Sequence, residues 1–517
     1  MRRRLACLLF ACLTLAPARL VRAQTFPTPD SVIRRIWQEG MERSQVERLA
    51  QVLMDSIGPR LSGSPGFQAA GDWLVRTYQG WGVTARQERY GTWRGWRQGP
   101  VHVDLVAPRG QGLEARLLAW SPGTVGVVEG DVVAPPETLG AGEAERWLAG
   151  VRGKWVLWSA PERMCRAPQE LERYARPETV QRIAAERRAS DDAWASRLTA
   201  LGGRTLVGRL ETAGAAGLLT SSWSDGWGVN KVFSTPTRAI PAVDLSCEDY
   251  GLLTRLATRG QGARIRVSAE SADLGEVPMF NVIAELTGTA LPNEFVVLSA
   301  HLDSWHAATG ATDNGTGTTT MLEAMRILRA VYPQPRRTIL VGHWGGEEQG
   351  LIGSGSFAQD HPEVLDGMQA LFNQDNGTWR IEYLEAQGYA RAGEHLGRWM
   401  GLVPLEISRN VQLDFPGPQS NPGSDHSSFV CRGVPAFRLQ SSYPEYRQYT
   451  WHTNRDTYDK IVFDDLRNNA TLAAMLAYAA SEDPERVPRD RVVLPIDPRT
   501  GQPRNWATCG TPRRSTR

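Results

Sequence analysis

The chain has 517 residues, of which 41% are hydrophobic and 22% are charged, as is usual for a folded protein. This length exceeds the size at which a single hydrophobic core usually stops growing, so we expect more than one domain. Five of the 58 basic residues lie in the first 23 positions, and without them 53 basic residues face 56 acidic ones. A net charge near −3 argues against nucleic-acid binding.

Residues 1–23 have the pattern of a secretory signal peptide. A basic start is followed by an apolar stretch from Leu5 to Leu15, and small residues precede a predicted cleavage after Ala23. The apolar stretch is shorter than the roughly 20 residues that span a bilayer. We therefore expect an extracytoplasmic protein, periplasmic or secreted, without stable insertion in a membrane.

The middle of the chain has a different secondary-structure pattern from the two segments that flank it. Residues 24–100 are predicted to be mainly helical at first, with a break rich in glycine and proline at 56–66. Residues 101–277 alternate short β-like segments with turns, which predicts a β-rich inserted domain. Within it, residues 161–202 form a densely charged helical segment. That segment fits either a solvated helix or an arm near the active site.

Residues 278–483 alternate between strand and helix patterns. Strands are predicted at 294–300, 337–344 and 367–373, and a helix at 317–332. Such alternation predicts an α/β fold, with a mixed, mostly parallel sheet flanked by helices and ligands bound at the carboxyl ends of the strands. The remaining residues, 484–517, are rich in proline and arginine and are expected to be extended.

Each of the three predicted strands is followed by side chains that can bind a metal. His301 and Asp303 follow the first strand, Glu347 and Glu348 the second, and Asp375 the third. A single glutamate pair or a single His-x-Asp would be an ordinary surface feature. Three such groups in succession, at the end where this fold binds ligands, predict a metal site.

Two further residues complete a ligand set. Asp313 lies in a glycine-rich loop before the predicted helix, and His452 supplies a second imidazole. One histidine and one carboxylate for each of two ions, with a shared carboxylate, is a natural set of ligands for zinc.

The chain resembles the M28 metallopeptidases, a co-catalytic zinc family that includes aminopeptidases and carboxypeptidase Q-like enzymes. The resemblance covers residues 31–95 and 278–480, and the segment between them is similar to a protease-associated (PA) domain. It implies a zinc-exopeptidase fold. The matching motifs, in the family's order, are GPRLSGSPG, SAHLDSWHAATGATDNGTG, GGEEQGLIGS, NQDNGT, GSDHSSF and WHTNRDT.

The resemblance implies two zinc ions per chain and assigns their ligands. His301 and Asp375 would bind one ion, Glu348 and His452 would bind the other, and Asp313 would bridge them.

The resemblance also implies roles for two acids outside the ligand set. Glu347 would be the general base, and Asp303 would orient the ring of His301. Asp303 lies two positions beyond His301, so in an extended chain both side chains point to the same face. A carboxylate that accepts the imidazole N–H would fix the tautomer of a metal-bound histidine.

The function implied is hydrolysis of short peptides or dipeptides from one end. A deacylase or another amidohydrolase, and a receptor-like binding module without metals, are the alternatives. A homodimer is expected by resemblance only. The sequence decides neither the end attacked nor the pairing of the four mature cysteines, Cys165, Cys247, Cys431 and Cys509. At His306, carboxypeptidase Q-like enzymes usually have aspartate, which bears on substrate preference.

Overall fold

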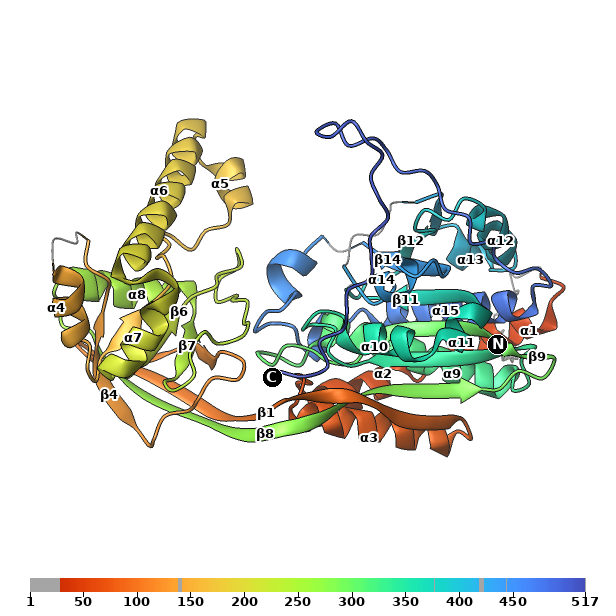
Figure 1. Cartoon of the computed structure of the whole chain (residues 1–517), viewed down its shortest axis with the longest axis horizontal. Coiled ribbons are helices and arrows are strands. Elements are labelled where there is room, and N and C mark those ends of the chain that lie inside the picture. Colours follow the sequence, from red (N-terminus) through yellow and green to blue (C-terminus); the bar gives the residue numbers. More distant parts are fainter. Residues whose placement is uncertain (1–27, 138–141, 376, 418–422, 443, 517) are drawn as a thin grey trace, which may run out of the picture.

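The computed structural model describes residues 28–137, 142–375, 377–417, 423–442 and 444–516. The predicted signal peptide, residues 1–23, lies outside the described residues. The described chain forms a larger and a smaller lobe, joined by two long strands (Figure 1). No helix within the described ranges is both long enough and apolar enough to cross a bilayer.

The larger lobe is built on a mixed sheet whose central strands are parallel. The strands are β8 (Arg264–Leu286), β9 (Leu291–His301), β10 (Arg337–Trp344), β11 (Met368–Gln374), β12 (Ile381–Glu385), β13 (Gln412–Asp414) and β14 (Ala436–Ser441). Their order is β13-β12-β14-β11-β9-β10-β8, in which β14, β11, β9 and β10 run parallel. β8 is antiparallel to β10, and β12 to β14. The predicted α/β fold is thus confirmed.

The central strands are buried along their length because both faces of the sheet are covered. Every residue of β10 and β11 is buried. Helices α9 (Thr316–Val331) and α15 (Phe463–Glu482) pack against each other and against β9. Elsewhere Trp344 of β10 contacts the rings of Phe357 and Phe429, from α10 (Ile352–Asp360) and α14 (Ser427–Val430).

The remaining helices of this lobe surround the sheet. α3 packs on the long strand pair; it begins at Pro65 and is capped by Ser64, whose Oγ accepts a hydrogen bond from the amide of Phe67 at 3.2 Å. The bounds are α1 (Ser31–Trp37), η1 (Gln38–Glu42), α2 (Val46–Gln51), η2 (Val52–Ile57), α3 (Pro65–Gly80), η4 (Ala311–Gly315), α11 (Pro362–Gly367), α12 (Ala392–Met400), α13 (Leu405–Ser408), η5 (Tyr446–Thr450) and η6 (Tyr458–Lys460).

Two long antiparallel strands connect the lobes. β1 (Thr84–Ala107) pairs with β8 from Thr84 opposite Glu285 to Ala107 opposite Arg264. Both strands run out of the larger lobe and into the smaller one (Figure 1). The smaller lobe is therefore an insertion, supported at its base by both strands.

The smaller lobe contains more helix than its sequence pattern predicted. Its strands β4, β5, β6 and β7 are parallel neighbours, and β3 is antiparallel to β7. Helices α4, α7 and α8 were not predicted, so the lobe is α/β in character. The bounds are β2 (Gln111–Leu113), β3 (Ala115–Leu117), β4 (Val128–Val133), α4 (Glu143–Ala149), β5 (Trp155–Leu157), α5 (Pro168–Tyr174), α6 (Pro177–Leu201), η3 (Gly203–Thr205), α7 (Leu206–Ala213), β6 (Gly217–Thr220), β7 (Ala242–Leu245) and α8 (Cys247–Thr258).

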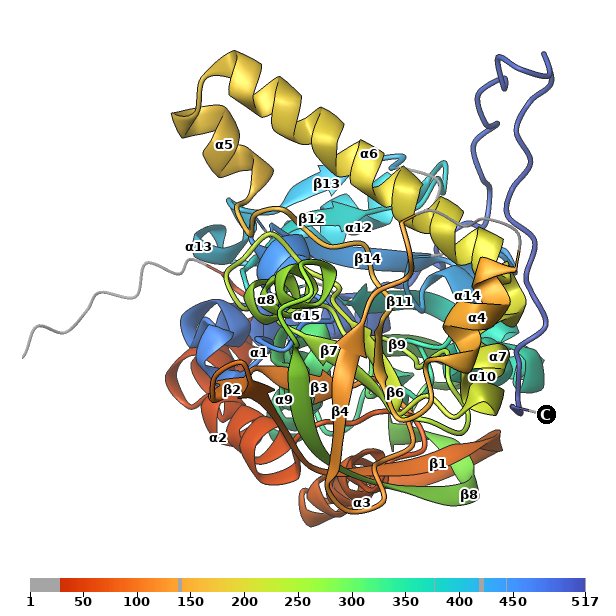
Figure 2. The same ribbon diagram turned by 90° about the vertical axis from the view of Figure 1, so that its left-hand side faces the viewer.

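The charged segment 161–202 forms α5 and α6, which project from this lobe (Figures 1 and 2). Only Ile183, Trp194 and Leu201 of α6 are buried, which fits a solvated helix held at a few points. Trp194 donates its indole N–H to the carbonyl of Trp158 at 2.8 Å.

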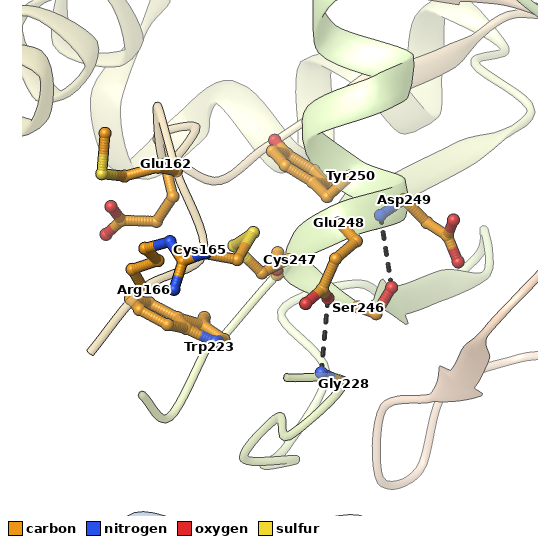
Figure 3. Close-up of a disulfide and its surroundings, with 12 residues drawn as sticks. Glu162, Cys165, Arg166, Trp223, Gly228, Ser246, Cys247, Glu248, Asp249 and Tyr250 are labelled. Carbon is orange, nitrogen blue, oxygen red and sulfur yellow. Dashed lines mark hydrogen bonds between the residues drawn. A yellow bond between two sulfur atoms is a disulfide. The ribbon is translucent and has the colours of Figure 1, made fainter. Parts of the chain in front are cut away.

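Two disulfides resolve the cysteine pairing that the sequence left open. Cys165, ahead of α5, pairs with Cys247 at the start of α8, beside the cap that Ser246 provides to Asp249 (Figure 3). Cys431 pairs with Cys509 of the C-terminal segment. Residues 484–516 of that segment contain no helix or strand.

Candidate functional site

Three neighbouring parallel strands of the larger lobe end at one edge of the sheet. β9 ends at His301, the turn after β10 carries Glu347 and Glu348, and Asp375 follows β11. Because the carboxyl ends of parallel strands meet at the same edge, the sheet topology alone brings these residues together. His301 and Asp375 are both buried, at 1% and 8% exposure.

The first cluster of potential ligands forms around the ring of His301. Its Nε2 lies 3.1 Å from Oδ1 of Asp375 and 3.4 Å from Oδ1 of Asp313. The three side chains are close enough together to hold one metal ion.

The second cluster forms around the ring of His452. Its Nε2 lies 2.9 Å from Oε2 of Glu348 and 3.1 Å from Oδ2 of Asp313. These three side chains could also hold an ion. Asp313 thus belongs to both clusters, with one carboxylate oxygen facing each imidazole. The structure brings the five predicted ligands together in the two groups that were expected.

Asp303 has contacts beyond the one predicted with the ring of His301. Nδ1 of His301 lies 2.9 Å from the backbone carbonyl of Asp303, whereas the carboxylate is 3.8 Å away. The carboxylate also accepts hydrogen bonds from the amides of Glu347 and Glu348, at 3.1 and 3.3 Å, and from the hydroxyl of Ser62 at 3.2 Å. Asp303 therefore connects the end of β9 to the turn after β10.

The electrostatics of the site favour a bound cation. Burial and the charge of Asp313 together raise the pKa of Glu348 to about 7, although His452 opposes the shift. Burial also raises the pKa of Glu347 well above its usual range, with Asp375 adding to the shift and His301 opposing it. Oε1 of Glu348 is buried and has no hydrogen-bond partner among the described residues. Crowded, desolvated carboxylates with an unsatisfied oxygen fit metal ions well.

Asp456 positions the shared carboxylate through the main chain. Its two oxygens accept hydrogen bonds from the amides of Thr312 and Asp313, at 2.8 and 3.0 Å. The loop reaches this position through Gly310, which has a φ of 60°. Sequence reasoning missed Asp456 although it lies in the quoted motif WHTNRDT.

Arg60 is a second residue whose role the sequence did not reveal. Its guanidinium group is fully buried and donates hydrogen bonds to the carbonyls of Leu302 at 2.8 Å, Thr309 at 2.6 Å and Gly310 at 2.8 Å. Burial lowers the pKa of Arg60 to about 10, although Asp456 and other nearby carboxylates oppose this shift. Arg60 thus ties the end of β9 to the loop that carries Asp313. Its place in the motif GPRLSGSPG was the only available signal.

The smaller lobe contributes side chains and main-chain groups beside His452. The amide of Val232 donates to the carbonyl of His452 at 2.9 Å. The Phe233 ring meets the rings of Trp305 and His452 edge-on, at centroid distances of 5.4 and 5.3 Å. Trp451 stacks on His452 at 3.8 Å. The larger lobe therefore provides the ligands, and the smaller lobe helps to enclose them.

Trp305 is tied to the ligand set itself. Its indole N–H donates to Oε2 of Glu348 at 2.8 Å, which fixes one oxygen of that carboxylate.

His306, where carboxypeptidase Q-like enzymes usually have aspartate, lies at the contact between the lobes. Nε2 of His306 lies 2.8 Å from the carbonyl of Leu117, and the ring meets Trp96 edge-on at 5.0 Å. Burial lowers its pKa to about 4. A buried ring with these partners joins the lobes rather than lining the entrance of the site.

The pair Asp425–His426 of the motif GSDHSSF lies outside both ligand clusters. Both side chains are buried, and the pKa of Glu347 is raised partly by Asp425.

A pocket of about 350 Å³ opens onto the two clusters. Glu347 lines it together with Glu348, Asp375 and His452, although Glu347 belongs to neither ligand cluster. Arg438, Arg447, Tyr446 and Trp451 line the same pocket. Glu347 thus lies in the same pocket as the candidate ligands without being one of them.

Comparison with known proteins agrees with this geometry. Residues 281–477 match the model of peptidase family M28. Carboxypeptidase Q of Mus musculus is 25% identical over 447 residues, covering 86% of this chain and 87% of that protein. Leucine aminopeptidase 1 of Uncinocarpus reesii is 32% identical over 222 residues, covering 38% of this chain and 54% of that protein.

Solved structures share the fold. The crystal structure of a peptidase M28 precursor from Shewanella amazonensis has a TM-score of 0.62 and 24% identity, over 88% of this chain and 97% of that one. The zinc aminopeptidase BSAP from Bacillus subtilis has a TM-score of 0.54 and 18% identity, over 86% and 96%.

The family match and the curated relatives therefore identify a peptidase. More specifically, residues 281–477 match the peptidase family M28 model, and the chain is similar over most of its length to carboxypeptidase Q.

Proposed function

We propose that the chain is a dinuclear zinc exopeptidase that hydrolyses short peptides or dipeptides. The observation that carries this proposal is the position of Asp313, whose two oxygens face His301 and His452 separately. A carboxylate in that position can be shared by two ions. The mixed imidazole and carboxylate ligands suit zinc, and a relative in fold is described as a zinc aminopeptidase.

Each of the two clusters would hold one ion. His301 and Asp375 would hold one ion, Glu348 and His452 would hold the other, and Asp313 would hold both. Trp305 and Asp303 would keep the glutamate turn in position, the first through the carboxylate of Glu348 and the second through its backbone amide.

The reaction assigned to the site is hydrolysis of a peptide bond. Zinc ions bound there would supply Lewis-acid chemistry, polarising the peptide carbonyl and making a water molecule more acidic. Glu347 is the remaining acid in the pocket next to the ligands, so it would accept a proton from the attacking water and pass it to the leaving amine. Asp303 orients Glu347 by accepting its backbone N–H.

We further propose an extracytoplasmic location. Disulfides persist in oxidising compartments, and the pairs Cys165–Cys247 and Cys431–Cys509 support this assignment. The homodimer expected from the resemblance stays a prediction.

The test is zinc-dependent hydrolysis of a small set of free and N-acetylated di- and tripeptides, followed by mass spectrometry. The protein is assayed as purified, after chelation, and after zinc is returned. Cleavage that disappears on chelation and returns with zinc supports the proposal. Cleavage that survives chelation, or none in any state, contradicts it.

A further inference from the structure

A second cavity, of about 780 Å³, lies where the long strand pair, the smaller lobe, the C-terminal segment and the turn after β10 meet. Trp93 and Arg94 of β1 line it from the strand pair, and the smaller lobe contributes Trp120 and Arg238. Arg513 of the C-terminal segment closes another side. The segment is held there by a hydrogen bond from the amide of Thr92 to the carbonyl of Arg514, at 2.9 Å. We call this space the basic-aromatic cavity.

The basic-aromatic cavity adjoins the candidate metal centre. Gln349 lines it and directly follows Glu348 in the chain, so their Cα atoms are only about 3.8 Å apart. Trp120 contacts Trp305 at a centroid distance of 6.0 Å, and Trp305 in turn donates to Glu348. The cavity is therefore within reach of a short peptide held at the centre, yet it contains none of the proposed ligands.

Two tryptophan rings form aromatic walls of the cavity. Trp93 and Trp120 are only 8% and 7% exposed, and the indole N–H of each is buried without a partner among the described residues. The side-chain amide of Gln349 is also buried without a hydrogen-bond partner among the described residues. The nitrogen atoms of these groups are closed off from solvent, so the cavity presents the rings of Trp93 and Trp120, rather than their N–H groups, to a ligand.

The charge of the cavity is strongly positive. Arg94 lies over the Trp120 ring at 4.8 Å, and Arg513 lies over the Trp93 ring at 5.4 Å. Within the described part of the chain, neither Arg94 nor Arg238 forms an ion pair. Among the described residues that line the space, Asp273 carries the one carboxylate, and its Oδ1 accepts from the amide of Gly275. Three guanidinium groups against one carboxylate favour an anionic ligand.

We propose that the basic-aromatic cavity binds a carboxylate of the peptide substrate beyond the scissile bond. Guanidinium donors match the two oxygens of a carboxylate, and Arg94, Arg238 and Arg513 bring three of them to the cavity. This inference rests on the proposed function, and it specifies the substrate class as peptides with a free carboxylate on that side. The carboxylate comes either from the C-terminus or from an acidic side chain.

The test compares three tripeptides on the zinc-loaded enzyme: a free acid, its C-terminal amide, and an amide with glutamate at the last position. Each is assayed with the wild type, Arg94→Gln and Arg238→Gln. Arg204→Gln is the matched control, because Arg204 is an exposed arginine of the smaller lobe and lies outside the cavity. Circular dichroism verifies that each variant is folded. Calorimetric titration of Glu347→Gln, with and without each arginine variant, measures binding apart from turnover.

We expect the wild type to have a KM about tenfold or more lower for a carboxylate-bearing peptide than for the plain amide. A preference for the free acid assigns the C-terminal carboxylate, and a preference confined to the glutamate peptide assigns an acidic side chain. Arg94→Gln and Arg238→Gln should each raise the KM of the preferred peptide about fivefold or more. The kcat for that peptide and the KM of the plain amide should not change. The same loss should appear in the titrations, and Arg204→Gln should change neither readout.

Two other outcomes separate the two proposals. Hydrolysis with equal KM for all three peptides, or a preference that neither Arg94→Gln nor Arg238→Gln reduces, would overturn this inference alone. Absence of zinc-dependent hydrolysis of every peptide would overturn the proposed function and this inference with it.

Discussion

The catalytic edge of the larger lobe and the facing side of the smaller lobe contribute to the site in different ways. At the edge, His301, Glu348 and Asp375 come from the ends of three adjacent strands, so the sheet itself sets their positions. The smaller lobe contributes Phe233 and the amide of Val232, which reach His452 only because the lobes are docked. Ligand positions therefore follow from local topology, whereas the enclosure of the pocket depends on tertiary contacts between lobes.

The largest effect is expected at the edge itself. Glu347→Gln keeps the shape of the side chain but cannot accept a proton, so kcat should fall by about 10²–10⁴-fold. Zinc content should be unchanged, because Glu347 is outside both ligand clusters. Steady-state kinetics together with elemental analysis test both statements. Full activity would remove Glu347 as the base.

A smaller effect is expected at Asp456, which contacts the loop that carries Asp313. In Asp456→Asn one of the two oxygens that accept from the amides of Thr312 and Asp313 becomes an N–H₂ group, so the loop loses an acceptor. Zinc affinity should fall about 10–100-fold, as measured by competition with a chelator. Asp459→Asn, at an exposed acid of the same segment, is the control. Equal affinities in both variants would show that Asp456 does not position Asp313.

Contact between the lobes should make stability depend on pH. The pKa of His306 is about 4 in the folded protein and about 6.5 when unfolded, so below pH 6.5 the unfolded state binds a proton that the folded state does not. Stability should therefore fall as the pH decreases from about 6.5 to about 4, and this residue alone should contribute a loss of about 2 kcal/mol between pH 7 and pH 5.

Urea unfolding of the wild type and His306→Asn at both pH values measures this contribution. The variant should lose about 2 kcal/mol less than the wild type over that interval. An identical pH dependence would mean that His306 is not buried as a neutral ring.

The smallest effect is expected from the smaller lobe's aromatic contact. Phe233→Ala removes the edge-on contacts with Trp305 and His452, which should raise KM about two- to tenfold. Phe233→Leu, which keeps part of the apolar surface, should lie between the alanine variant and the wild type. An unchanged KM would show that the smaller lobe does not enclose substrate.

The sequence was informative where function follows from strand ends. Strands predicted at 294–300, 337–344 and 367–373 correspond to β9, β10 and β11, and the residues after them converge because parallel strands share an edge. Asp313 and His452 could be proposed from residue type alone. Their grouping into two clusters came from the family resemblance, and the structure places them in that arrangement.

The sequence was uninformative where function acts through the main chain or through docking. Arg60 and Asp456 bind backbone groups far away in sequence, which no periodicity indicates. Proximity in sequence pointed to the ring of His301, 3.8 Å from the carboxylate of Asp303, but not to the turn after β10, which the same carboxylate also reaches. Helices α7 and α8 of the smaller lobe were missed because short apolar segments fit strands as well as helices.

The central claim is that Asp313 is shared by two zinc ions, and its most direct test is the zinc content of the purified protein. Elemental analysis should find two zinc ions per chain in the wild type. Asp313→Ala should retain fewer than half as many, while Asp459→Asn should retain both. A single zinc ion in the wild type, or two in Asp313→Ala, would contradict the account.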